Sequence, residues 1–226
     1  MKKMNWILAS CTKGYVWITA LLSLLFSVWF GKINALCGIP FPQGPGDLQI
    51  QTFFRWQLLI IPPLMAASEY LNSMKALEVF IKLRIKNDSQ FLKSQLAVTM
   101  GIAVFWGAVV AVLGVITVPQ RKFAVIYTIL GQVLWMSLYL TLYFIRESAA
   151  AAITGTVFST ASLFFIGELW NPYCSFLPTS WTMASRSRDW TSDGIPALIS
   201  IGGSTFFICS FLAIIYLMHR KRRMRI

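Results

Sequence analysis

The chain contains little charge, few acidic residues and a single histidine. Only 12% of its 226 residues are charged; eight are acidic, and the one histidine is His219. Soluble domains carry about twice that share of charge, and metal sites and acid–base catalysis draw on clusters of His, Asp, Glu or Cys. The composition therefore excludes an ordinary soluble domain, and we expect no metal site.

Sequence motifs of the common enzyme classes are missing too. The chain has neither the His-Glu-x-x-His motif of metalloproteases nor a Gly-x-x-x-x-Gly-Lys-Ser/Thr loop for ATP. Residues 202–206, Gly-Gly-Ser-Thr-Phe, lack the closing glycine of a serine-hydrolase elbow. We therefore expect no enzymatic activity and no cofactor bound by this chain.

Long apolar stretches are what the chain has instead. Hydrophobic residues make up 57% of it, and the mean hydropathy is +0.65. Five uncharged stretches cover residues 14–31, 94–120, 123–145, 148–167 and 194–218, and a sixth lies between Arg55 and Lys75, interrupted only by Glu69. Each is close to the roughly 20 residues that cross a bilayer as a helix. The sequence predicts an all-α polytopic membrane protein: one domain, 1–226, with six transmembrane helices.

The positions of Lys and Arg predict the orientation of these helices. If both termini are cytoplasmic, 14 of the 20 basic residues lie on the inner side, as the positive-inside rule requires. We therefore expect a multi-pass protein of the cell membrane with both ends inside, and no nucleic-acid partner despite the net charge of +12. Cys37 and Cys174 would both face outside; whether they pair stays open.

Four segments between or before the spans have distinct patterns. Residues 1–13 place Met4, Ile7, Leu8 and Cys11 at helical spacing, which predicts a helix in the inner membrane interface; the alternative is a frayed tail. Only residues 118–122 connect the third and fourth spans, which predicts that these two form an antiparallel hairpin. The outer loop, 168–193, is rich in aromatic residues, which favour the headgroup region, so we expect it to rest on the outer leaflet or to dip into it.

The inner loop, 75–93, is the fourth segment. Its Leu77, Phe80, Ile81 and Ile85 follow helical spacing, which predicts a helix exposed to the cytoplasm. The alternative is a linker lying on the lipid headgroups.

A few residues within the spans are unusual for a membrane helix. Pro62 and Pro63 remove backbone donors and should bend their helix, either as a hinge or as a static kink held by neighbouring helices. Glu69, Gln132 and Glu168 are candidates for a substrate pathway or a polar contact, although the two glutamates lie near span ends and can reach the headgroups. Small residues of the third span favour close helix packing: Gly101, Gly107, Ala108, Ala111 and Gly114.

This layout, together with the segment EYLNSMKALEVFIKLRIKNDSQFLKSQ at 69–95, resembles the six-helix membrane subunits of ABC-2-type transporters. The resemblance is to the small bacterial permeases of peptide-export and bacteriocin-immunity systems in particular. It implies that 75–93 contains a coupling helix that docks into a separate ATPase subunit, which would bind ATP and Mg²⁺. The docking residues it implies are Leu77, Phe80, Ile81, Arg84 and Ile85.

Six helices are few for enclosing the route of a large substrate. We therefore expect a second permease subunit, identical or different, to complete the pathway for a peptide or other amphipathic substrate. Membrane lipids are the remaining expected partners. The alternative function is a stand-alone membrane sensor or immunity protein that binds a peptide at its outer loop without transport and without an ATPase.

Overall fold

The computed structural model describes residues 14–30, 50–76, 88–117, 124–169, 176–188 and 194–223. Within these ranges the chain is helical, with no strand and one isolated bridge between Ser187 and Ile195. The long helices are α2 (Gly14–Phe30), α3 (Ile50–Ala76), α5 (Asp88–Thr117), α6 (Ala124–Arg146), α7 (Ala149–Leu169) and α9 (Ala197–Arg223); the short ones are α8 (Pro178–Trp181) and the 3-10 helix η3 (Ala184–Arg186). The all-α prediction is confirmed for this part of the chain.

Three of these helices are long and apolar enough to cross a membrane: Ser89–Val115, Val125–Arg146 and Ala197–Arg220. Shorter apolar stretches, Val16–Leu25 and Ala149–Phe165, lie in α2 and α7. Large hydrophobic side chains also cover the outside of the bundle, for example Leu21 at 60% and Phe206 at 68% exposure. Exposed apolar surface of this extent is unfavourable in water and favourable in lipid. The chain is therefore a membrane-embedded helical protein.

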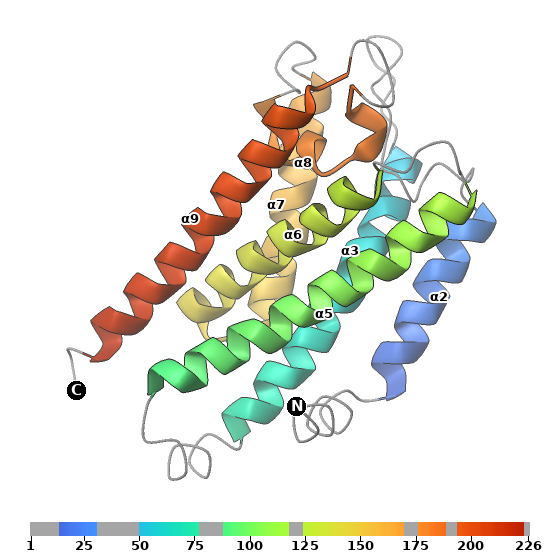
Figure 1. Ribbon diagram of the computed structural model, residues 1–226. Helices are drawn as coiled ribbons and strands as arrows, with labels where there is room; N and C mark the ends of the chain where they lie inside the picture. The colour runs from blue at the N-terminus through green and yellow to red at the C-terminus, as the bar shows by residue number, and fades with distance from the viewer. Residues whose placement is uncertain are drawn as a thin grey trace.

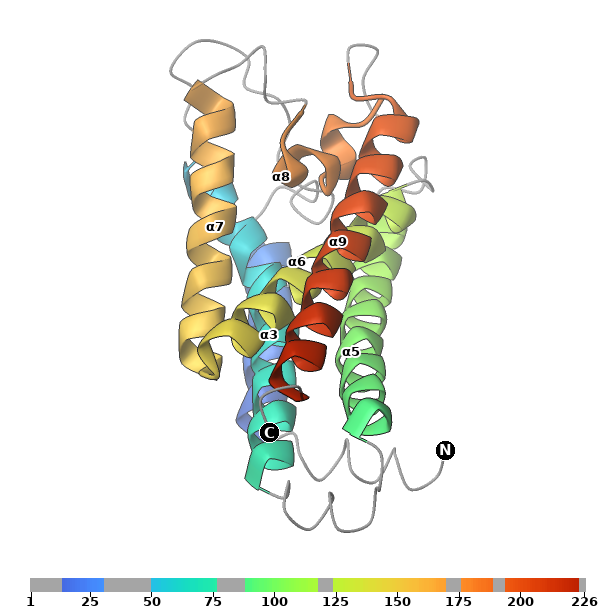
Figure 2. The same cartoon turned by 90° about the vertical axis from the view of Figure 1, so that its left-hand side faces the viewer.

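Helix α6 lies at the centre of the bundle. It packs against α5, α7 and α9, and also contacts α3 (Figures 1 and 2). The main core includes Met136, Tyr139 and Leu140 of α6 together with Ala67 and Leu71 of α3. A second, smaller cluster joins α2, α3 and α5 through Ala20, Leu59, Trp106 and Val110.

Helices α5 and α6 form the antiparallel hairpin that the sequence predicts. Gly107 explains their close approach, because a Cβ added there would lie 3.0 Å from the Cα of Ile129. Gly101, by contrast, has no neighbouring atom within 4 Å of such a Cβ. Of the small residues, Gly107 is thus a packing contact and Gly101 is not.

The link between α6 and α7 is tight. Glu147 has a positive φ of 56°, and the next residue, Ser148, accepts a hydrogen bond at its Oγ from the backbone N–H of Ala151, 3.4 Å away. A serine at this position caps the first turn of α7. This short connection holds α7 beside one face of α6, while α9 lies on another (Figure 2).

The described part of the aromatic outer loop folds into the bundle and does not lie flat on its end. Helix α8 packs against α7 and α9, and η3 packs against α6 (Figure 2). The ring of Trp181 lies 5.8 Å from that of Phe207 and is 9% exposed, since Gly203 leaves room for it. A Cβ on Gly203 would come within 2.6 Å of the indole. Phe176, in contrast, is 65% exposed.

Candidate functional site

The Pro62–Pro63 pair lies inside α3, which continues as one helix over Ile50–Ala76. Both prolines are buried. Proline has no backbone N–H, and its ring crowds the carbonyl four residues earlier. The carbonyl of Leu59 therefore loses the donor that residue 63 would otherwise supply.

Side chains of two neighbouring helices replace that donor. The indole Nε1 of Trp106, on α5, donates to the carbonyl oxygen of Leu59 at 2.8 Å. The amide Nε2 of Gln132, on α6, donates to the same oxygen at 3.2 Å. Freed backbone groups at membrane depth need partners of this kind, because lipid supplies none. One backbone oxygen thus connects α3, α5 and α6.

A second polar contact connects α3 to α7, two residues before Leu59. The Nε2 of Gln57 donates to the Oγ1 of Thr160 at 2.6 Å, and the Thr160 hydroxyl donates onward to the carbonyl of Val157 at 2.8 Å. The Oε1 atoms of Gln57 and Gln132 are buried and have no donor within the described residues. Buried acceptors like these are suited to bind ordered water.

These contacts bear on the two interpretations of the proline pair. A static kink requires that neighbouring helices satisfy the freed backbone, and Trp106 and Gln132 do so for Leu59. A hinge at Pro63 would have to break or carry along both hydrogen bonds. The hinge stays a prediction, and the structure identifies the bonds on which it depends.

The other predicted pathway residues are not part of this site. Glu69 lies on α3 nearly two turns after the prolines and is partly exposed. Glu168 is the second-last residue of α7, and its side chain lies outside the described part. Of the three, only Gln132, which is 7% exposed, takes part in the site, through its hydrogen bond to the Leu59 carbonyl.

The predicted docking residues Leu77, Phe80, Ile81, Arg84 and Ile85 lie outside the described residues, as do the interfacial segment 1–13, Cys37 and Cys174. The structure does describe the helices on either side of 77–87. The end of α3 and the start of α5 lie at the same end of the bundle, where α9 also ends (Figures 1 and 2). Exposed basic residues gather at this end: Lys75, Lys93, Arg146 and Arg220.

A buried arginine at the opposite end is a feature that sequence reasoning missed. Arg186 is 1% exposed. Its Nη1 donates to the Oγ of Ser180 at 3.1 Å, and its Cζ lies 5.5 Å from the ring centroid of Phe164 on α7. The backbone of Arg186 also accepts a hydrogen bond from Ile195 N at 2.8 Å. Arg186 thus ties η3 to α8, to α7 and to the chain that enters α9.

Within the described residues, no three His, Cys, Asp or Glu side chains form a group that could hold a metal ion. Comparisons with models of protein families, with curated proteins and with solved structures find no match to this chain.

Proposed function

We propose that the chain is the transmembrane subunit of an ATP-driven ABC exporter. In this proposal it crosses the membrane six times with both termini in the cytoplasm, and ATP is hydrolysed on a separate ATPase subunit. A second permease subunit completes the pathway, and the cargo is a peptide or another amphipathic molecule.

One observation carries this proposal. The segment 77–87, which contains the five proposed docking residues, connects two long helices at the basic end of the bundle. Basic residues favour the cytoplasmic side of a membrane. An ATPase that binds there would act on both helices at once.

The hydrogen bonds to the Leu59 carbonyl suggest how a movement of the docking segment would be transmitted to the proline pair. Coupling between distant sites needs packed, rigid elements with two arrangements. Helices α3 and α5 both adjoin the docking segment, and Trp106 joins them again at the Leu59 carbonyl. A push at 77–87 would therefore reach this carbonyl along both helices, and a bend of α3 at the proline pair would break its hydrogen bonds or carry Trp106 and Gln132 along.

The proposal is tested by co-purification with an ATPase subunit encoded in an adjacent reading frame. We expect Ile81→Asp to abolish co-purification, because a carboxylate would be buried in the interface. The control Lys82→Asn, on the polar face of the predicted helix, should keep it. Both variants must reach the membrane fraction in the amount of the unchanged protein. Co-purification of Ile81→Asp at full yield would refute the docking site, and full activity in cells that lack every candidate ATPase would favour the stand-alone sensor.

A further inference from the structure

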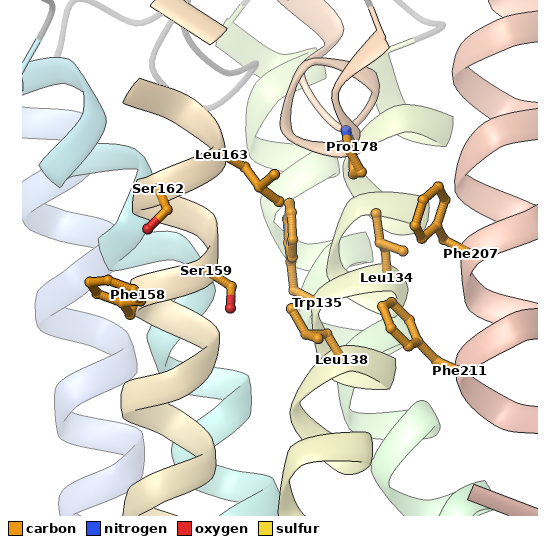
Figure 3. A pocket seen from close by; sticks show the side chains of 10 residues that line it. All are labelled: Leu134, Trp135, Leu138, Phe158, Ser159, Ser162, Leu163, Pro178, Phe207 and Phe211. Carbon is orange, nitrogen blue, oxygen red and sulfur yellow. The ribbon is translucent and has the colours of Figure 1, made fainter. Parts of the chain in front are cut away.

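A groove opens on the side of the bundle between α7 and α9. Helix α6 forms its floor, with Trp135 lying along it, and Pro178 of α8 closes its outer end (Figure 3). Phe207 and Phe211 project into it from α9 (Figure 3). Its volume is about 370 Å³, within the range of roughly 300–1,000 Å³ that is usual for small-molecule sites.

The lining of the groove is apolar. Eight of the ten residues labelled in Figure 3 have apolar or aromatic side chains, and none is charged. The two exceptions, Ser159 and Ser162, lie three residues apart on one face of α7. Being small, they leave the space that larger residues would fill, and their hydroxyls can turn back to carbonyls of their own helix.

The groove lies at membrane depth. Its floor belongs to Val125–Arg146 and its α9 wall to Ala197–Arg220, two of the helices with the length and apolarity of a span. The opening between α7 and α9 therefore faces hydrocarbon. A charged or strongly polar ligand would find no partner for its charge there.

The chemistry and the opening of the groove favour one apolar occupant. Its lining offers no charged side chain, and its open side faces the hydrocarbon region, where the acyl chains of lipids are the surrounding molecules. A flexible hydrocarbon chain is thin enough to enter from the side and to contact α6, α7 and α9 together.

We propose that this groove binds one hydrocarbon chain of a membrane lipid. An empty groove would leave its walls without dispersion contacts on one side, and lipid chains are the molecules at its opening. The chain is held more firmly than bulk lipid because it contacts protein on three sides. This site does not depend on the exporter proposal, since it requires only that the bundle is embedded in a membrane.

The test compares how much lipid is retained by the unchanged protein and by a variant whose groove is filled with a larger side chain. We expect native mass spectrometry of the full chain, purified in a mild detergent, to show one retained phospholipid that Ser162→Phe removes. The control Thr154→Phe, at an exposed position of the same helix outside the groove, should retain it. Equal retention by both variants, or adducts of detergent alone, would overturn the proposal.

A second measurement avoids any effect of the substitutions on folding. The unchanged protein is reconstituted in phosphatidylglycerol–phosphatidylethanolamine vesicles that contain a phospholipid with a diazirine on one acyl chain. After irradiation, groove residues such as Phe207 and Phe211 should be labelled several-fold more than Leu21 of α2, which is exposed on a surface outside the groove. Uniform labelling of both surfaces would mean that only bulk lipid is present.

Discussion

The two hydrogen bonds to the Leu59 carbonyl can be tested by restoring the donor that Pro63 removes. Trp106→Phe and Gln132→Leu each delete one donor while keeping most of the side-chain volume. Pro63→Ala returns a backbone N–H to the position from which it can donate to Leu59 in the helix. With that donor present, the two side-chain bonds become dispensable.

The expected losses in the free energy of unfolding depend on how many hydrogen-bond donors the Leu59 carbonyl keeps. A hydrogen bond between membrane helices contributes about 0.6 kcal/mol on average. Each single substitution should therefore lower the free energy of unfolding by about that amount. The double variant leaves the carbonyl buried without a donor, which costs about 1–3 kcal/mol. Its loss should therefore equal or exceed the sum of the two single losses. In the Pro63→Ala background the same double substitution should cost less than in the unchanged protein, because the restored N–H donates to the carbonyl and only the loss of side-chain packing remains.

The assay is reversible unfolding of the purified chain in mixed micelles of dodecyl maltoside and SDS. The free energy of unfolding is measured for the unchanged protein, both single variants and the double variant, and for Pro63→Ala with and without the double substitution. Equal losses from the double substitution in the unchanged and the Pro63→Ala backgrounds would refute the reasoning, because the bonds would then owe nothing to the missing N–H. The Pro63→Ala protein also tests the hinge. A hinge predicts that transport falls while the free energy of unfolding is maintained or rises.

Two further pairs of variants test the packing. Gly107→Ala should lower the free energy of unfolding by about 1–3 kcal/mol, since its Cβ would press on the backbone of α6. The control Gly101→Ala, in open space on the same helix, should be neutral or stabilising. Equal effects of the two substitutions in the same unfolding assay would contradict the close contact. Arg186→Met should cost about 2 kcal/mol or more, because it removes a charged hydrogen bond and a contact with an aromatic ring. The exposed Arg188→Met is the control and should change the unfolding midpoint little; a stable Arg186→Met protein would show that the arginine does not hold the outer loop in place.

The proline pair shows how far sequence reasoning reaches at the candidate site. The spacing of the helix alone identifies Leu59 as the residue whose carbonyl loses its donor to Pro63, because the bond spans four residues. Which side chains replace the donor depends on the rotation and approach of α5 and α6. Trp106 and Gln132 are 47 and 73 residues away along the chain, and no local pattern links them to Leu59.

The outer loop contains two buried side chains that its composition does not predict. Tyrosine and tryptophan of membrane proteins are enriched at the headgroups. Here Gly203 leaves a gap on α9 that accepts the ring of Trp181, and Ser180 and Phe164 receive Arg186. Both residues are buried because, in the described part of the loop, α8 packs against α7 and α9 and η3 packs against α6, contacts that composition cannot reveal.

The sequence by itself determined that this protein is helical and lies in a membrane, because an excess of apolar residues in long uncharged stretches has no other favourable environment. It also located the break in the hydrogen bonding of α3, since proline lacks an N–H wherever it stands. Only the tertiary structure decided which neighbours satisfy that break, that Trp181 and Arg186 of the outer loop are buried in the bundle and that α7 and α9 leave a groove over α6. These features depend on how helices distant in sequence approach one another, and the fit of individual side chains sets that approach.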